Sequence, residues 1–294
     1  MATFDFKGKE VISRFDTDLA SNSTWYTDAN GREMQERIRD YRKTWKLNNT
    51  EPVAGNYYPV NSRIYVQDKS KKTQFTVLTD RFQGGSSLKD GSVELMLHRR
   101  LFKDDGKGVN EALNETGQFG DGLIIRGRHW IVFDTIANSS AAHRLLGEKL
   151  LLRPAVAFNR DSGSPKDYLT KYNVMYSAVS RELPANIHLL TLQFVDANTV
   201  ILRLEHQFEK NEDSTLSKPV TVSLDGLFKP FKIESMTELV LGANDELSNV
   251  HRLQWKTAEE EAPVMQEEKR DDLKANSVTL NPMEIRTFEV KISG

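Results

Sequence analysis

The segment SRIYVQDKSKKTQFTVLTD, residues 62–80, decides the fold class. Apolar and polar side chains alternate in RIYVQD and again in QFTVLT, on either side of the turn sequence DKSKK. A period of two residues is typical of a strand with one buried face, whereas a helix repeats every 3.6 residues. The segment therefore predicts an antiparallel hairpin of two half-buried strands.

The same pattern recurs along the chain. Residues 23–38 (STWYTDANGREMQERI) predict a second hairpin around Asn30-Gly31, because both residues accept the positive φ of a tight turn. Residues 92–100 (SVELMLHRR) place alternate apolar side chains on one face. Further strands are predicted at residues 128–136, 187–195, 199–208, 220–224, 231–241, 251–257 and 284–292.

One short helix is predicted at residues 139–151. A serine cap precedes Ala141, Leu145, Leu146 and Leu150, whose spacing gives one apolar face.

The expected architecture is mostly β, with antiparallel sandwiches. Residues 159–173 are rich in turn formers and residues 258–276 in charges, so we expect a linker and a loop there. We predict a central β-sandwich region over residues 1–185, which contains the helix, and a smaller terminal β-sandwich over residues 186–294.

Composition excludes several classes of protein. The 294 residues carry a formal net charge of −2 with both signs dispersed, so we expect no nucleic-acid partner. No segment approaches the roughly 18 apolar residues of a membrane-spanning helix. The first residues also lack the apolar core of a signal peptide, so we expect neither membrane association nor a signal peptide. The absence of cysteine excludes disulfides, thiolate metal sites and cysteine nucleophiles.

Candidate catalytic residues are few. The six histidines stand outside the spacings that form a local zinc chelate, so we expect no metal site. Asp104 and Asp105 are adjacent on an extended segment and point to opposite faces, whereas the two carboxyl groups of a glycosidase converge on one bond. We expect no catalytic residue in this chain. The favoured interpretation is a turn whose Asp side chains accept hydrogen bonds from backbone amides, with glycines at positive φ.

Two other patterns each allow two interpretations. Aromatic residues on strands suit a sugar-stacking platform, but they more often belong to a hydrophobic core. Sequons among polar or turn residues tolerate a glycan, but so short a pattern also arises by chance. The aromatic residues are Trp25, Tyr26, Tyr57, Tyr58, Trp130 and Trp255. The sequons begin at Asn22, Asn48, Asn114 and Asn138.

Three segments together resemble the C-terminal β region of the lysosomal-type α-mannosidases of glycoside hydrolase family 38. They are YTDANGREMQERIRDYRKTWKLNNTEPVAGNYYPVNSRIYVQD (26–68), LTDRFQGGSSLKDGSVELMLHRRLFKDDGKGV (78–109) and NPMEIRTFEV (281–290). The resemblance implies a supersandwich-like β region whose partner is an N-terminal catalytic barrel. In that barrel, His and Asp ligands hold zinc beside an aspartate nucleophile and a carboxylic acid/base. The His-x-Asp zinc motif has no counterpart in this sequence, so we expect no cofactor in this chain.

The resemblance also implies a role for the turn around Asp104 and Asp105. In the family this turn reaches toward the pocket of the barrel, and the position of Lys107 is commonly arginine, which contacts the substrate or shapes the pocket. Lys107 is therefore the predicted substrate-proximal residue, supported by Arg100, Asp104 and Asp105. Lysine lacks the bidentate fork of arginine, so it either acts as a point charge or has lost the role.

We predict the C-terminal portion of a retaining α-mannosidase that acts on mannose-containing glycans. This portion completes and buttresses the active site and is inactive alone. The family follows the secretory route to the lysosome, which favours glycans at Asn22 and Asn48. Two alternatives are a freestanding carbohydrate-binding module and an interaction protein that uses an exposed interface.

Overall fold

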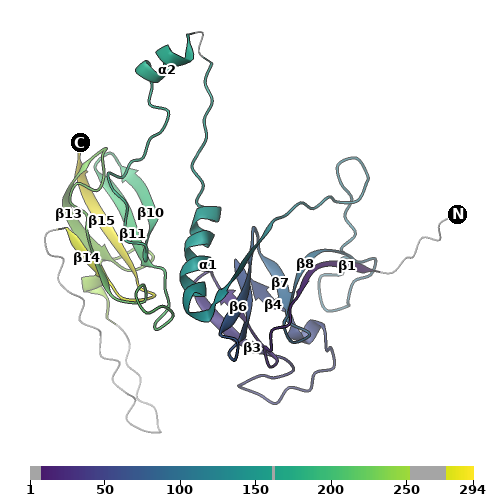
Figure 1. Ribbon diagram of the computed structural model, residues 1–294. Coiled ribbons are helices and arrows are strands. Elements are labelled where there is room, and N and C mark those ends of the chain that lie inside the picture. The colour runs from purple at the N-terminus through teal and green to yellow at the C-terminus, as the bar shows by residue number, and fades with distance from the viewer. Residues whose placement is uncertain (1–7, 161–162, 252–275) are drawn as a thin grey trace, which may run out of the picture. The chain divides into compact units, whose positions relative to one another are not determined.

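The computed structural model describes residues 8–160, 163–251 and 276–294 (Figure 1). The chain divides into two compact units, residues 1–153 and 154–294. The predicted mostly β class is confirmed, because strands dominate both units and the named strand pairs are antiparallel. Residues 154–185 lie with the second unit, whereas the division predicted at residue 185 places them with the first.

Unit 1 contains two antiparallel sheets. The four-stranded sheet has the order β1-β8-β7-β4 and the five-stranded sheet the order β3-β2-β5-β6-β9. Both sheets contribute to one apolar core, which consists of Leu19, Trp25, Val60, Ile64, Val66, Phe75, Val77, Val93 and Leu95. The strands are β1 (Lys9–Asp16), β2 (Thr24–Ala29), β3 (Glu33–Ile38), β4 (Tyr58–Val60), β5 (Arg63–Asp68), β6 (Thr73–Thr79), β7 (Gln83–Ser86), β8 (Ser92–Arg100) and β9 (His129–Thr135). A 3-10 turn, η1 (Ala54–Asn56), precedes β4.

The turn predicted at Asn30-Gly31 is confirmed, and a buried carboxylate holds it in place. Asn30 and Gly31 have φ values of 55° and 72°. Asp28 on β2 is 1% exposed and accepts a 2.9 Å hydrogen bond from the Gly31 amide. It also accepts bonds of 2.9 to 3.0 Å from the backbone amides of residues 61, 62 and 63. One carboxylate therefore joins the β2–β3 hairpin to the start of β5.

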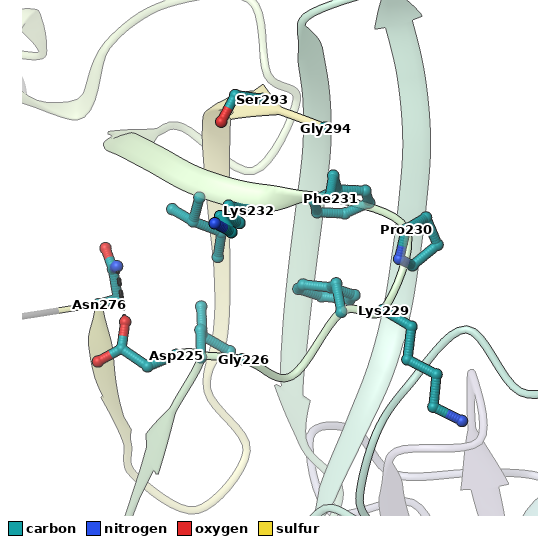
Figure 2. A pocket seen from close by; sticks show the side chains of 12 residues that line it. Asp225, Gly226, Lys229, Pro230, Phe231, Lys232, Asn276, Ser293 and Gly294 are labelled. Atoms are coloured by element: carbon teal, nitrogen blue, oxygen red, sulfur yellow. Dashed lines mark hydrogen bonds between the residues drawn. The ribbon is translucent and has the colours of Figure 1, made fainter.

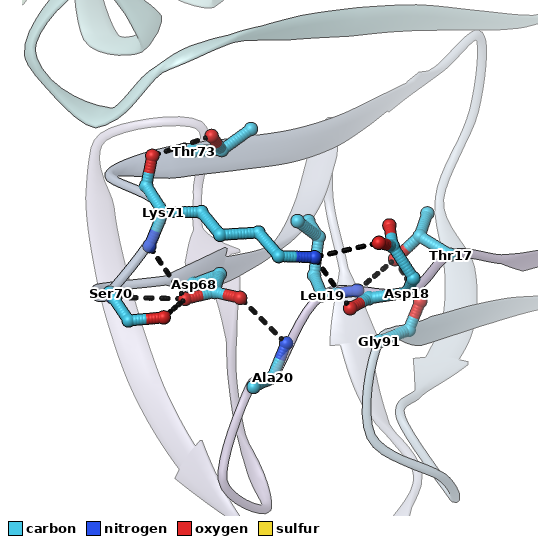
Figure 3. A network of polar contacts seen from close by, with 9 residues as sticks. All are labelled: Thr17, Asp18, Leu19, Ala20, Asp68, Ser70, Lys71, Thr73 and Gly91. Atoms are coloured by element: carbon cyan, nitrogen blue, oxygen red, sulfur yellow. Dashed lines mark hydrogen bonds and ion pairs between the residues drawn. The ribbon is translucent and has the colours of Figure 1, made fainter.

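The predicted turn between β5 and β6 is also confirmed, and Asp68 ties it to the segment before β2 (Figure 3). Asp68 accepts hydrogen bonds from the Ser70 hydroxyl (2.6 Å) and from the backbone amides of Ser70, Lys71 and Ala20 (2.9 to 3.0 Å). These bonds, that from the Ser70 hydroxyl foremost, hold the pKa of Asp68 well below its ordinary value. Lys71 Nζ lies 2.7 Å from Asp18 Oδ2 beside this network.

The helix α1 (Ile136–Leu151) differs from the prediction at both its start and its buried face. It begins three residues early, where the Thr135 hydroxyl accepts from the amide of Asn138 (3.3 Å). The predicted apolar face of Ala141, Leu145, Leu146 and Leu150 is only partly buried. The buried positions are Ser139, Ser140, His143, Arg144 and Gly147.

The reason lies in the strands that α1 contacts. α1 packs on β6 and β9, and β5 and β6 are almost fully buried instead of half-buried as predicted. One face of β5 and β6 points to the apolar core, while the other carries polar groups such as Arg63 and Thr76. A polar sheet face requires hydrogen-bonding partners, so the helix buries its polar side against it.

Unit 2 contains a four-stranded sheet of order β10-β11-β15-β13 and a two-stranded sheet of β12 and β14. Its strands are β10 (Ile187–Asp196), β11 (Thr199–His206), β12 (Val220–Ser223), β13 (Lys232–Leu239), β14 (Ser277–Leu280) and β15 (Ile285–Ser293). Large apolar side chains from both sheets, including Leu202, Leu280 and Phe288, form its core. Of the predicted strand 251–257 and loop 258–276, only His251 and Asn276 lie within the described residues.

The described part of unit 2 also contains two short helical segments. The predicted linker 159–173 contains the helix α2 (Pro165–Lys171), where Ser164 Oγ accepts from the Asp167 amide (3.2 Å). A proline at the first position and a serine cap are ordinary helix-start signals, so this element was readable in the sequence. A 3-10 turn, η2 (Leu247–Asn249), follows β13.

Candidate functional site

The turn at residues 104–108 lies in the long connection between β8 and β9, and its side chains shape its own backbone. Asp104 Oδ2 accepts from the Gly106 amide (2.7 Å), and Asp105 Oδ1 accepts from the Lys107 amide (2.9 Å). Gly106 has a φ of 72°. These are the backbone-capping bonds that the sequence predicts. Each of the two carboxylates therefore orders the backbone of the turn.

The base of this turn is closed by the residues at the end of β8. The Leu101 amide donates to the Leu113 carbonyl (2.9 Å), and Arg100 Nε donates to Asn114 Oδ1 (2.7 Å). The Arg100 guanidinium also lies 5.3 Å from the centre of the Phe102 ring. Arg100 is thereby held at the base of the loop, and Asn114, predicted only as a sequon, is brought against it.

Lys107 is exposed, and none of the described residues forms an ion pair with it. Its amide is fixed by Asp105, so the backbone is ordered while the ammonium group remains available to a ligand or another domain. A lysine ammonium offers three donors. The arrangement can therefore present one positive charge at the tip of an ordered turn.

The described residues contain no group of three or more His, Asp or Glu side chains that could hold a metal ion. The donor set that zinc requires is therefore not found in this part of the chain. None of the described helices is long and apolar enough to cross a membrane.

Two of the candidate aromatic residues, Trp25 and Tyr58, contact other side chains of unit 1. Trp25 is fully buried in the core of unit 1, and its ring meets Tyr58 edge-on at 5.9 Å. The Tyr58 ring is covered by the guanidinium groups of Arg37 (4.2 Å) and Arg42 (5.0 Å). The core interpretation is thus confirmed for Trp25, while Trp255 lies outside the described residues.

Unit 2 has an open pocket of about 860 Å³ beside the start of β13 (Figure 2). Asp225 accepts from Asn276 Nδ2 (2.8 Å) at one side of it. Phe228 and Phe231 stack on each other at 4.9 Å and are both buried. These rings belong to the core, so the pocket offers no exposed aromatic face to a sugar.

The four sequon asparagines are all exposed. Asn22 lies in a turn with a φ of 48°, and Asn48 in the irregular segment before β4. Asn138 lies in the first turn of α1, and the second serine of its sequon, Ser140, is buried against the sheet. Their glycosylation stays a prediction.

Two family models match the chain. The glycosyl hydrolases family 38 C-terminal domain matches residues 2–107, and the glycosyl hydrolases family 38 C-terminal beta sandwich domain matches residues 186–288. The first match includes Arg100, Asp104, Asp105 and Lys107. The two matches lie one after the other along the chain, on either side of the unmatched residues 108–185.

Individual proteins show the same similarity. The chain is 51% identical to human lysosomal alpha-mannosidase over 286 residues, which are 97% of this chain and 28% of that protein. It is 40% identical to the alpha-mannosidase of Canavalia ensiformis, covering 97% of this chain and 30% of that protein. The fold resembles that of an alpha-mannosidase from Enterococcus faecalis V583, with a TM-score of 0.55, 12% identity and coverage of 95% of this chain and 25% of that one. The chain thus spans less than a third of the length of these relatives.

Proposed function

Because this chain belongs to glycosyl hydrolase family 38, through the C-terminal region of that family, we propose that it is the C-terminal β portion of an α-mannosidase. The substrate of the whole enzyme is a mannose-containing glycan. The observation that carries the proposal is the presence of both C-terminal family domains in one chain that is 51% identical to human lysosomal alpha-mannosidase over 97% of its length.

Within this enzyme the β portion has a supporting role. The family resemblance implies an N-terminal barrel that holds the zinc and the catalytic carboxylates, and the described residues contain no group of three or more potential metal ligands. The β portion completes and buttresses the active site of that barrel. Alone, it does not hydrolyse α-mannosides.

The turn at residues 104–108 is the part of the chain that reaches the substrate. Asp104 and Asp105 order its backbone, and Arg100 anchors its base through Asn114. Lys107 then projects one ammonium group that donates hydrogen bonds to hydroxyl groups of the bound glycan. Lysine acts there as a point charge, because it cannot reproduce the two parallel bonds of a guanidinium.

The relatives named lysosomal point to the same compartment for the whole enzyme. The secretory route would expose the sequons at Asn22 and Asn48 to glycosylation, and both asparagines are on the surface.

The proposal is tested first on this chain alone. Incubation with an aryl α-mannoside and added zinc should give no turnover above buffer, and any saturable turnover would overturn the supporting role. Titration with mannose oligomers, followed by tryptophan fluorescence, distinguishes the supporting role from the alternative of a carbohydrate-binding module. A saturable change at sub-millimolar oligomer would favour that module, whereas the supporting role predicts none.

A further inference from the structure

A second open pocket, of about 880 Å³, lies in unit 1 where the edge strands of its two sheets approach each other. β1 is the edge of one sheet and β9 the edge of the other, and Phe15 on β1 meets the His129 ring at 6.0 Å. Thr79 at the end of β6 pairs with His129 at the start of β9. This register brings residues 80–81, which follow β6, beside residues 126–128, which precede β9.

An ion pair is built into the wall of this pocket. Arg81 Nε and Nη2 donate to the two carboxylate oxygens of Asp80 at 2.9 and 3.1 Å. Asp80 also accepts from the Arg128 amide (3.0 Å), and Arg81 donates to the Arg126 carbonyl. The pair thus clamps the backbone of residues 126–128 in place, and the only carboxylate of the pocket lining is already neutralised by Arg81.

A second clamp holds the ring of His129. Gln83 Nε2 donates to the Met96 carbonyl (2.8 Å), so Gln83 Oε1 is left to accept, and His129 Nε2 lies 2.8 Å from it. His129 therefore donates from Nε2, which fixes its tautomer. Burial lowers the pKa of His129, so the ring is neutral at pH 7.

The charge left over in the pocket is positive. Its lining includes three arginines against the single carboxylate of Asp80. Arg126 and Arg128 are exposed, and no described residue forms an ion pair or a side-chain hydrogen bond with either guanidinium group. Two free guanidinium forks on an ordered backbone suit the oxygens of a phosphate or sulfate group.

We propose that this pocket binds a phosphate or sulfate monoester, with Arg126 and Arg128 holding the anion. The apolar side chains of Leu97 and Ile125, which also line the pocket, lie against the organic part of the ligand. Asp80 and Arg81 act as positioning residues, because they fix the backbone that carries both arginines. The inference does not depend on the proposed mannosidase role, since its test uses this chain alone.

Titration calorimetry on the whole chain tests the proposal with inorganic phosphate, sulfate, a hexose 6-phosphate, the free hexose and acetate. We expect one site that binds the phosphate and sulfate probes and neither acetate nor the free hexose. Tighter binding of the hexose phosphate than of inorganic phosphate would support a monoester as the ligand, whereas equal binding would contradict it, because the organic part would then contribute nothing. The assignment would be overturned if none of the phosphate and sulfate probes bound, or if acetate bound with the same affinity as they do.

Variants that each lose one arginine distinguish a specific anion site from nonspecific attraction of anions to a positively charged surface. R126Q and R128Q should each weaken phosphate binding by about tenfold, which corresponds to about 1.4 kcal/mol. R160Q removes one exposed arginine from unit 2 and should change the affinity by less than about twofold. An equal loss in all three variants would mean nonspecific attraction. As a second readout, the His129 ring resonances should shift on phosphate addition, and no shift would place the anion elsewhere.

Discussion

The Nδ1 atom of His143 on α1 lies 2.9 Å from Nη1 of Arg63 on β5. His143 is 1% exposed, and burial together with the nearby charges of Arg63 and Arg144 holds its pKa well below the ordinary value. The neutral ring accepts from Arg63, so α1 is joined to the sheet by a contact that depends on an uncharged histidine.

This contact predicts that acid weakens unit 1. Below pH 6.5 the unfolded chain protonates His143 while the folded chain keeps it neutral, so the unfolded state binds more protons and stability falls as pH falls. One such proton contributes a slope of at most about 1.4 kcal/mol per pH unit. The H143Q variant, whose amide oxygen can still accept from Arg63, should lose less free energy of unfolding between pH 7 and pH 5. Equal losses in urea titrations of both proteins would contradict the role of His143.

The buried carboxylate of Asp28 should be one of the most sensitive positions in unit 1. D28A would leave four backbone amides without their acceptor, and removal of a buried charged partner costs about 3 to 5 kcal/mol. D28N keeps one oxygen and should lose clearly less. The measurement is urea unfolding followed by the fluorescence of buried Trp25. A loss below about 1 kcal/mol for D28A would show that water satisfies these amides.

Gly91 and Gly106 form a matched pair, because both have positive φ values, 71° and 72°. A Cβ atom at Gly91 would meet the carbonyl oxygens of Leu19 at 2.6 Å and Thr17 at 2.7 Å, whereas a Cβ at Gly106 meets nothing within 4 Å. G106A should therefore cost only the strain of a left-handed residue, about 1 kcal/mol. G91A adds a backbone clash and should lower the free energy of unfolding by about 3 kcal/mol or more. Similar losses would mean that the segment at residues 17–19 moves aside.

Lys107 should affect activity without affecting stability. In the assembled enzyme, K107M should lower kcat/KM for a mannose oligosaccharide by about tenfold to a hundredfold, as expected for a lost charge-assisted hydrogen bond. K107R should retain or raise the activity, because arginine provides a fork in place of a single ammonium. K89M is the control, since Lys89 is also exposed and lies outside the turn. If K107M and K89M have the same kcat/KM, the turn does not contact the substrate.

Local signals in the sequence predicted most of the strands of this fold. Asn30-Gly31 and the turn at residues 69–72 were readable because their chemistry is confined to a few neighbouring residues. The strands β1, β4, β7 and β14 were not predicted. Pro59 interrupts the pattern of β4, and two glycines interrupt that of β7. The buried face of α1 was predicted wrongly. Helical periodicity identifies the apolar side of a helix, but the sheet face that α1 contacts carries polar residues such as Arg63, which hydrogen-bonds to His143 on the helix.

Of the two candidate sites, one could be predicted from local sequence and the other could not. The capped turn at Asp104 and Asp105 depends on bonds across two residues, so its geometry followed from the sequence. The pocket that is lined by Arg126 and Arg128 brings residues 80–81 beside residues 126–128, which are more than forty positions away in the sequence. That meeting depends on the pairing of Thr79 with His129, a long-range register that local patterns do not encode.

We propose that this chain completes an α-mannosidase whose catalytic groups lie elsewhere. The most direct test is the initial rate of aryl α-mannoside hydrolysis by three samples: this chain, a separately produced N-terminal barrel of the same enzyme, and their mixture. We expect the mixture to be active, this chain alone to be inactive, and the barrel alone to be far less active than the mixture. Activity of this chain alone, or a barrel that gains nothing from the chain, would contradict it.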